Sequence, residues 1–316
     1  MLEVIVIGFD LHSDIEITLE ANPGTVSFIY FKELRELGIN RISVGMQSII
    51  PGELKLLERQ HDAFDIIHSI KWARQAGFEN INLDLIFGLP DQGISQWQKS
   101  LIQAVGLRPD HLSLYALSLE HGTPLRTWVD RGIVNEPDDD IAADMYDWST
   151  EYLGQNEYDQ YEISNWAVKG VGEEIKSCRH NLQYWRNLPY LGVGAGAHGF
   201  VDGYRTANIL SPMQYIQRCL EGGVNPFPRT PATASLLEID SETEMHETMM
   251  MGLRLTREGI SALDFSARFG KSIEEVFGKE IETLIGLGLL EWGNMRRLRL
   301  TKAGRLLGNQ VFIRFV

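Results

Sequence analysis

The strongest constraint on the fold of this chain is an alternation of strand-like and helix-like segments from about residue 16 to residue 164. In the helix-like segments, apolar residues recur at three- and four-residue spacing, and Gly38 and Gly77 follow two of them where helix C-terminal caps belong. Repeated β–α units with right-handed crossovers predict a parallel sheet, either open or barrel-like. The expected strands are 16–22, 41–47, 81–90, 111–118 and 158–164, and the expected helices are 26–38, 51–58, 63–77, 95–105 and 140–154.

The pattern changes after about Ser211, where helical segments follow one another without intervening strands. Two short strands around a Gly293-Asn294 turn come next, and a helix and a last strand end the chain. Helices followed by a β-hairpin predict a winged-helix-like module. We therefore expect two domains, 1–205 and 206–316, with the boundary in the 201–211 link. The expected helices of the second domain are 212–221, 241–254, 260–269 and 273–288.

Charge and cysteine content exclude several classes of protein. A formal net charge of −14 argues against a general nucleic-acid or anionic-membrane binder, and the only basic cluster, at 296–299, is small. No apolar run approaches the ~20 residues that a membrane span needs. Two cysteines, Cys178 and Cys219, cannot form a disulfide framework, which favours a reducing, cytoplasmic setting. They also cannot hold an iron–sulfur cluster unaided, because such clusters usually take three or four thiolates.

Four polar residues fall at the ends of expected strands or just after them. In parallel β/α folds, ligand-binding groups gather at the carboxyl ends of the strands. Carboxylates and amides there can bind the ammonium, ribose and amide groups of a nucleotide-like ligand, and a guanidinium can take a carboxylate. The alternative is that each is a helix cap or an ion-pair partner. These residues are Glu20, Gln47, Arg59 and Asp84.

Asp84 carries most weight among them, because it interrupts the apolar run INLDLIFGLP, where a carboxylate is costly unless it is paired. His61 follows Arg59 by two residues and is expected near the same rim. The remaining histidines outside 177–200, His111 among them, are scattered, and the sequence gives them no role.

The segment SCRHNLQYWRN (177–187) combines Cys178 and His180 with Tyr184 and Trp185. A cysteine and a histidine are too few for a structural zinc site, which takes four ligands. A haem needs only one or two axial ligands and an apolar, aromatic wall, so a haem-contacting surface and a merely packed loop both remain open. The glycine-rich tract GVGAGAHG (192–199) lacks the spacing of a phosphate loop, which favours close backbone packing against a flat ligand or a neighbouring strand.

Taken in order, these segments resemble the coproporphyrinogen III oxidase-like branch of the radical S-adenosylmethionine (SAM) proteins, and the haem-chaperone (HemW-type) members more closely than the oxidase. The resemblance covers residues 15–200, and the element HNxxYW, here His180, Asn181, Tyr184 and Trp185, separates the chaperones from the oxidases and is linked in that family to haem binding. The matching segments are EITLEANPGT, GINRISVGMQS, LLERQHD, INLDLIFGLPDQ, RPDHLSLYALSLEHGTP, YEISNWA, CRHNLQYWRN and YLGVGAGAHGF.

The resemblance assigns roles to individual residues. It places the SAM or haem rim near Ser118 and His198, and it makes His180 or Cys178 a ligand of haem iron. The SAM-contacting positions fall on the four polar residues found above: Glu20, Gln47, Arg59 and Asp84. The fold it implies is α/β, a partial parallel (β/α) barrel of the radical SAM type, followed by a helical, winged-helix-like C-terminal domain.

The chain departs from this family at its start. The family opens with C-x-x-x-C-x-x-C and a GGGTP turn, neither of which is present, and MLEVIVIGF aligns with the helix after GGGTP although it looks strand-like. We therefore expect no 4Fe–4S cluster from this chain alone, no SAM cleavage, doubtful SAM affinity and an exposed sheet edge. A truncated gene product or gene prediction, or a partner that supplies the missing part, would each account for this.

The leading functional hypothesis is therefore a HemW-like protein that binds haem or a porphyrin and transfers it to an acceptor haem protein. An oxygen-independent coproporphyrinogen III oxidase is the enzymatic alternative, disfavoured by the HNxxYW element and the missing cysteines. A non-catalytic interaction module or relic is the third reading, and failure to bind haem or SAM would favour it.

Overall fold

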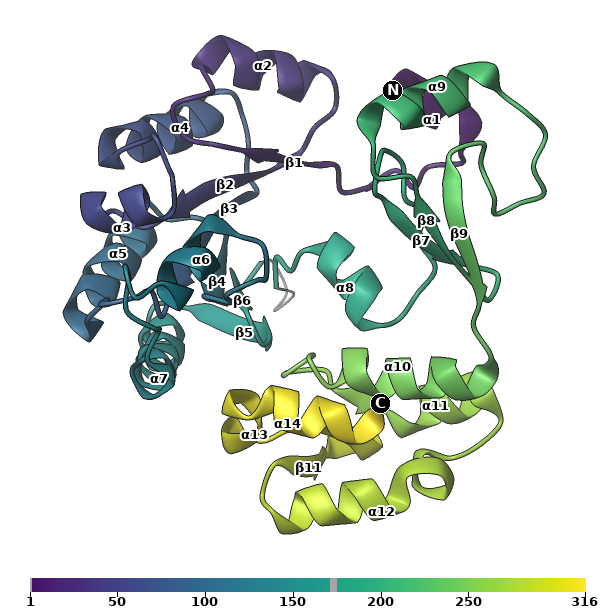
Figure 1. Cartoon of the computed structure of the whole chain (residues 1–316). Coiled ribbons are helices and arrows are strands. Elements are labelled where there is room, and N and C mark those ends of the chain that lie inside the picture. Colours follow the sequence, from purple (N-terminus) through teal and green to yellow (C-terminus); the bar gives the residue numbers. More distant parts are fainter. Residues whose placement is uncertain (1, 171–174) are drawn as a thin grey trace. The chain divides into compact units, whose positions relative to one another are not determined.

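The computed structural model describes residues 2–170 and 175–316 and divides into two compact units, Met1–Ser177 and Cys178–Val316. The sequence placed its boundary at 205/206, which falls instead inside a strand of the second unit, β8 (Tyr204–Asn208). Each unit is described separately below (Figure 1).

The first unit is built on a six-stranded sheet with the order β1-β2-β3-β4-β6-β5. The first four strands pair in parallel, as the β–α alternation predicts. The last two do not, because β6 follows β5 after a tight turn and pairs antiparallel with both β5 and β4. The sheet is therefore parallel as expected except at this edge, where β6 was not expected from the sequence. The strands are β1 (Thr18–Ala21), β2 (Arg41–Gln47), β3 (Ile81–Phe87), β4 (His111–Ala116), β5 (Tyr158–Glu162) and β6 (Asn165–Val168).

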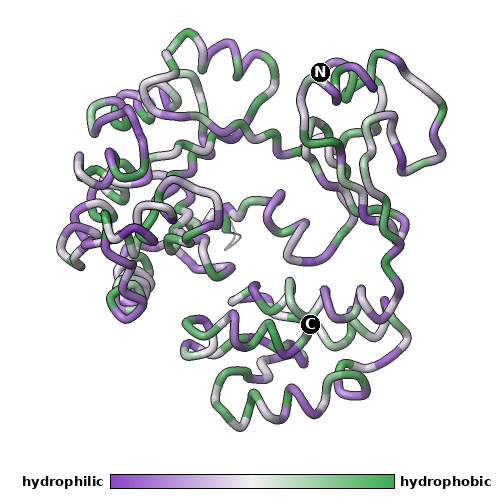
Figure 2. The backbone as a smooth tube through the Cα atoms, in the orientation of Figure 1, coloured by the Kyte–Doolittle hydropathy of each residue, from purple (hydrophilic) through white to green (hydrophobic). Residues whose placement is uncertain are grey.

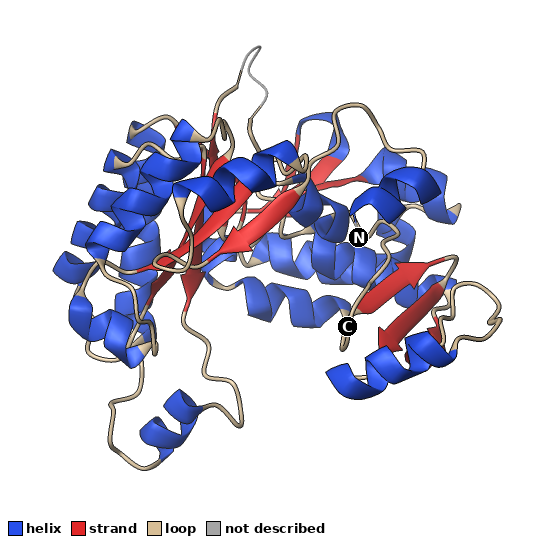
Figure 3. Ribbon diagram, turned by 90° about the horizontal axis from the view of Figure 1, so that it is seen from above, coloured by secondary structure: helices blue, strands red, loops and turns tan. Residues whose placement is uncertain are grey.

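Helices cover one face of this sheet (Figures 1 and 3). Side-chain caps define several of their first turns; Asp62, for example, accepts hydrogen bonds from the backbone N–H groups of Phe64 and Asp65. The five helices expected between the strands all form. They are α2 (Phe28–Glu36), α3 (Pro51–Leu56), α4 (Ala63–Gln75), α5 (Ile94–Gly106) and α7 (Asp139–Gln155), and a short additional helix, α6 (Pro124–Asp130), precedes α7.

The two faces of the sheet differ in polarity, because successive side chains of a strand point to opposite sides. On β2, Ile42, Val44 and Met46 are fully buried in the hydrophobic core, with similarly alternating apolar residues of β3 and β4 and residues of the covering helices. The intervening residues, such as Arg41 and Ser43, are polar yet also buried. The helix-free face is therefore a buried polar surface, which suits the inner wall of a partial barrel.

The N-terminal segment that looks strand-like forms a helix, α1 (Leu2–Gly8), as the resemblance indicated. Its apolar side chains are mostly exposed: Val4, Val6 and Ile7 are 73%, 61% and 87% exposed. An apolar composition alone therefore did not decide between strand and helix here.

The second unit opens with α8 (Arg179–Trp185) and contains two small sheets. One is the antiparallel sheet β7-β8-β9, formed by β7 (His198–Val201), β8 and β9 (Thr233–Glu238), with α9 (Pro212–Glu221) inserted between β8 and β9. None of these three strands was expected from the sequence, which predicted a link at 201–211. Hydrophobic and hydrophilic stretches alternate along the helices of this unit, as in the first (Figure 2).

The C-terminal module has the helices and hairpin of the winged-helix-like pattern. The hairpin forms between β11 and β12, but its turn is a three-residue 3₁₀ segment, Asn294–Arg296. The expected last strand was wrong: Ile313–Phe315 is a 3₁₀ turn, and the Phe315 ring packs against Phe277 at 5.5 Å between centroids. The elements are α10 (Ser241–Gly252), β10 (Ile260–Ser261), α11 (Ala262–Phe269), α12 (Ile273–Gly286), β11 (Leu290–Gly293), β12 (Arg297–Leu300), α13 (Lys302–Leu306) and α14 (Gly308–Phe312).

Candidate functional site

The polar face of the first unit brings Glu20 and Asp84 together across β1, β2 and β3. Glu20 is in register with Ser43, whose hydroxyl donates to Asp84 Oδ2 at 2.8 Å. Glu20 is exposed and Asp84 is partly buried. Two acidic side chains therefore share one face, one reaching solvent and the other held within the sheet.

Burial raises the pKa of the Asp84 carboxyl above its ordinary value, and the negative charge of Glu20 acts in the same direction. Hydrogen bonds from Ser43 and Asn82, each 2.8 Å long, oppose this by stabilising the carboxylate. Donors on β2 and β3 therefore offset the cost of placing a carboxylate in this apolar run, which the sequence analysis expected to be costly unless paired.

Gln47 and Arg59 lie at the carboxyl end of the same face. Arg59 Nη1 donates to Asn22 Oδ1 at 2.6 Å, just beyond the end of β1. Gln47, at the end of β2, has a left-handed backbone (φ 60°) next to a register shift. A Cβ added at Gly45 would lie 3.0 Å from Gln47 Nε2 and 3.5 Å from Asn22 Oδ1. Gly45 therefore lies close to both amides, and a side chain at this position would press against them.

The remaining rim residues of the first unit have mixed positions. Ser118 follows β4, is exposed and donates to Glu120 Oε1 at 3.3 Å. His61 is buried, and its Nε2 lies 3.1 Å from the Met46 carbonyl oxygen, so it supports the end of β2 rather than presenting a ring to solvent.

Sequence reasoning missed a buried hydrogen-bonded chain behind Asp84. Asn82 Nδ2 donates to Asp84 Oδ1 at 2.8 Å, Asn82 Oδ1 lies 2.6 Å from His111 Nδ1, and His111 Nε2 lies 2.7 Å from the Tyr161 hydroxyl. His111 is fully buried, so the view that it needs no role was wrong. Its signal was the two-residue spacing of polar side chains in INLDLIF and HLSLY, which marks one face of each strand.

In the second unit, His180 and Tyr184 of the HNxxYW element lie one helical turn apart on α8. Their ring centroids are 4.8 Å apart and nearly perpendicular, and Tyr184 makes a second edge contact with Tyr190 at 4.5 Å. His180 is exposed, and burial next to Tyr190 raises the pKa of the Tyr184 hydroxyl. An imidazole and two phenol rings thus form one aromatic group.

The other predicted residues of this segment lie in different surroundings from His180 and Tyr184. Cys178 is the N-cap residue of α8 and only 3% exposed, which leaves its thiol little access to a ligand. Asn181 is partly buried on α8. Trp185 lines a separate cavity, and the Arg254 guanidinium stacks 4.5 Å from the centroid of its ring. The HNxxYW residues therefore do not form a single cluster.

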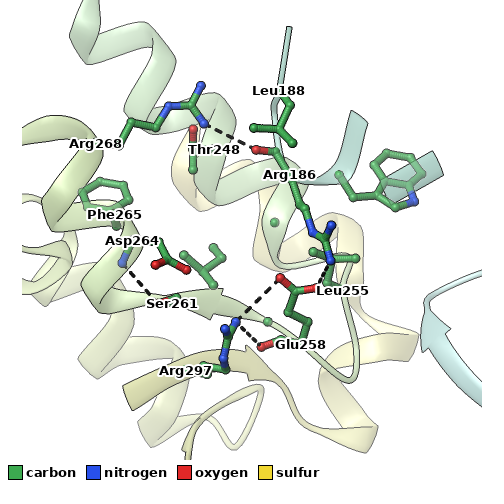
Figure 4. Close-up of a pocket in the computed structure, with 14 residues that line it drawn as sticks. Arg186, Leu188, Thr248, Leu255, Glu258, Ser261, Asp264, Phe265, Arg268 and Arg297 are labelled. Atoms are coloured by element: carbon green, nitrogen blue, oxygen red, sulfur yellow. Dashed lines mark hydrogen bonds and ion pairs between the residues drawn. The ribbon is translucent and has the colours of Figure 1, made fainter. Parts of the chain in front are cut away.

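The cavity beside Trp185 has a volume of about 240 Å³ and lies within the second unit, between the residues after α8 and the C-terminal module (Figure 4). Leu188, Leu255 and Phe265 contribute apolar surface. Glu258 bridges two arginines at its edge: Arg186 Nη2 donates to it at 2.7 Å, and Arg297 Nη1 lies 3.8 Å from its other oxygen.

The glycine-rich tract is explained by close packing of the backbone on a neighbouring strand, one of the two alternatives drawn from the sequence. A Cβ at Gly192 would lie 2.0 Å from the carbonyl oxygen of His198, and Gly199 is pressed against Thr206. Tyr190 and Phe200 exchange backbone hydrogen bonds of 2.7 and 2.9 Å. His198 itself is exposed at the start of β7, and its assignment to the SAM or haem rim stays a prediction.

Among residues 2–170 and 175–316, no three His, Cys, Asp or Glu side chains are grouped so as to hold a metal ion. The two cysteines, one buried and one exposed, do not fit the three or four thiolates that a 4Fe–4S cluster usually takes. No helix in those two ranges is long and apolar enough to cross a membrane.

Comparison with known families identifies two segments. Residues 2–102 match the radical SAM superfamily, whose cofactors are SAM and a 4Fe–4S cluster, and residues 239–307 match the HemN C-terminal domain. Both matches agree with the fold expected from the resemblance.

Curated relatives extend this over nearly the whole chain. The haem chaperone HemW of Bacillus subtilis is 36% identical over 301 residues, covering 95% of this chain and 76% of that protein. The haem chaperone HemW of Lactococcus lactis is 33% identical and covers 100% of this chain and 79% of that protein. The Escherichia coli haem chaperone HemW is 36% identical, with coverages of 89% and 69%.

The solved structure of coproporphyrinogen III oxidase (HemN) from Escherichia coli superimposes with a TM-score of 0.80, covering 99% of this chain and 72% of that one at 20% identity. This likeness concerns the fold. The fold and the family matches together define a radical SAM-type protein with a HemN-type C-terminal domain. Within that class, the chain belongs to the HemW family of haem chaperones.

Proposed function

We propose that this chain binds haem and hands it to an acceptor haem protein, with His180 on α8 as the ligand of the haem iron. The observation that carries this proposal is the exposed His180 imidazole flanked by the rings of Tyr184 and Tyr190. A haem needs one or two axial ligands and an aromatic or apolar wall, and this group supplies both types of contact.

The choice of His180 over Cys178 is supported by exposure. The Cys178 thiol is 3% exposed at the start of α8, so ligation through sulfur would require the first turn to open. His180 is exposed to solvent on the same helix. Transfer to another protein also favours a ligand at the surface, because the acceptor must reach the iron.

Haem titration followed by the Soret band tests this proposal. His180→Ala is expected to shift the band and weaken binding at least tenfold, whereas Cys178→Ser is expected to keep the wild-type spectrum. His121→Ala, which removes an exposed histidine of the first unit, is the matched control and should leave the titration unchanged. A wild-type Soret band in the His180→Ala protein would remove His180 from the haem site.

We also propose that the first unit binds SAM through Glu20, Gln47, Arg59 and Asp84. The proposal is supported by Glu20 and Asp84 lying on one face of the sheet, with Gln47 at the end of β2 and Arg59 bonded to Asn22 just beyond β1. Carboxylates and amides suit the ribose and ammonium groups of SAM, and the guanidinium suits its carboxylate.

Isothermal titration with SAM tests the second proposal. Glu20→Gln keeps the size of an exposed side chain and is expected to weaken binding about tenfold, which corresponds to ~1.4 kcal/mol. Glu36→Gln, an equally exposed change on α2, should bind as the wild type does. Equal affinity of the two variants would show that Glu20 makes no ligand contact.

A further inference from the structure

The buried chain behind Asp84 crosses the middle of the first unit and has a defined direction. It runs from Tyr161 of β5 through His111 of β4 and Asn82 of β3 to Asp84. Asn82, His111 and Tyr161 are 1%, 0% and 3% exposed, so water does not compete for these groups. Each donor and acceptor must therefore be satisfied within the protein.

The orientation of the Asn82 amide follows from the protons available to its neighbours. Ser43 has one hydroxyl proton, which it donates to Asp84 Oδ2, so its oxygen accepts from Asn82 Nδ2 at 2.7 Å. The second Nδ2 proton goes to Asp84 Oδ1. The carbonyl oxygen of Asn82 then faces His111 and Ser113, and the Ser113 hydroxyl donates to it at 3.1 Å.

This orientation fixes the tautomer of His111. Since Asn82 Oδ1 is an acceptor, His111 Nδ1 must carry the proton at this 2.6 Å contact. In a neutral imidazole Nε2 is then an acceptor, and the Tyr161 hydroxyl donates to it. Burial, helped by the positive charge of Arg41, lowers the pKa of His111 well below its ordinary value and keeps the ring neutral.

We propose that His111 is a positioning residue for Asp84: its Nδ1–H locks the Asn82 amide so that the NH₂ group, and not the carbonyl oxygen, faces the Asp84 carboxylate. A flipped Asn82 would place its carbonyl oxygen against that carboxylate and turn its NH₂ group toward the Nδ1–H. This role rests on the proposed contact of Asp84 with SAM, because what His111 holds in place is the carboxylate that would bind the ligand.

Two variants of nearly equal shape test this role. His111→Asn retains an N–H donor at about the position of Nδ1, whereas His111→Leu removes it, and both lose the bond from Tyr161. SAM titration is expected to show His111→Asn within about threefold of the wild type and His111→Leu at least tenfold weaker. Equal affinities for the two variants would overturn the proposal, since the Nδ1-type donor is what distinguishes them.

A second measurement needs no ligand. Nitrogen NMR of the full chain labelled at histidine is expected to show the His111 ring neutral with the proton on Nδ1, and Tyr161→Phe should shift the Nε2 signal. A proton on Nε2 in the wild type would overturn the proposal. If the wild type binds no SAM, the proposed SAM contact fails, while the NMR result still decides for or against the His111–Asn82 arrangement.

Discussion

Gly45→Ala separates the folding role of the β2 face from its proposed ligand-binding role. The added methyl group would lie 3.0 Å from Gln47 Nε2, 3.5 Å from Asn22 Oδ1 and 3.9 Å from the Ala21 carbonyl oxygen. The tightest contact is with the end of a flexible side chain, which can move by a few tenths of an ångström. Glycine also costs a strand interior roughly 0.5–1 kcal/mol relative to alanine, so the free energy of unfolding should change by less than about 1 kcal/mol.

The effect on binding should be much larger. The methyl group would occupy the surface on which the ligand is proposed to lie and would displace the Gln47 amide. Losing one hydrogen bond costs about 1 kcal/mol, and forcing a methyl into a packed contact costs about 1–3 kcal/mol. We therefore expect SAM affinity to fall about 30-fold or more, at 1.4 kcal/mol per tenfold.

Calorimetric titration with SAM and urea unfolding monitored by circular dichroism measure the two effects on the same protein. Gly52→Ala on α3 is the matched control, because a Cβ there meets nothing within 4 Å. Unchanged SAM affinity in a stable Gly45→Ala protein would refute a ligand lying over Gly45. A large loss of stability would refute the argument that Gln47 can yield.

Two further predictions concern stability. Gly192→Ala would push the backbone before β7 away from His198 and break the Tyr190–Phe200 hydrogen bonds. We expect the free energy of unfolding to fall by about 3–5 kcal/mol, seen as a fall of about 10 °C in the Tm of the second unit. A wild-type Tm would contradict the packing interpretation. His111 stays neutral when folded but takes up a proton when unfolded below its ordinary pKa of 6.5, so the stability of the first unit should fall as pH drops below about 6.5, by up to ~1.4 kcal/mol per pH unit. His111→Asn should abolish that contribution in urea titrations at pH 7 and pH 5.5, and an unchanged slope would refute it.

Much of the fold could be predicted because its signals are local. The five expected strands and five expected helices of the first unit all form, since period-two and period-3.6 patterns reflect which side of each element is buried. The antiparallel turn-back of β6 was not predictable in this way, because Asn165–Val168 is short and its partner β4 lies more than 40 residues earlier in the chain. Ile313–Phe315 has strand-like residues, but its packing against α12 decides its conformation.

The positions of candidate site residues could be predicted where they follow from the order and direction of the strands alone. Glu20 and Asp84 could be placed near one edge because parallel strands end together there, and they share a face because side chains two apart on a strand point the same way. Asn82 and His111 were not predicted, since a single polar residue was taken as an interruption of a buried run, whereas polar residues two apart define the inner face of the strands. Asn82 and His111 are 29 residues apart and meet only because their strands pair, and the sequence alone does not give that pairing.

The residues of the HNxxYW element make two separate sets of contacts from α8. His180 and Tyr184 share one side, with Tyr190, while Trp185 is held by Arg254 at the cavity of the C-terminal module. Loss of the indole would remove the Arg254 contact and loosen the helix that carries His180, the proposed ligand of the haem iron. A Trp185 variant that loads haem poorly would therefore resemble a variant of the iron ligand. Measuring both its haem affinity and the stability of α8 would tell a loosened helix from a lost iron ligand.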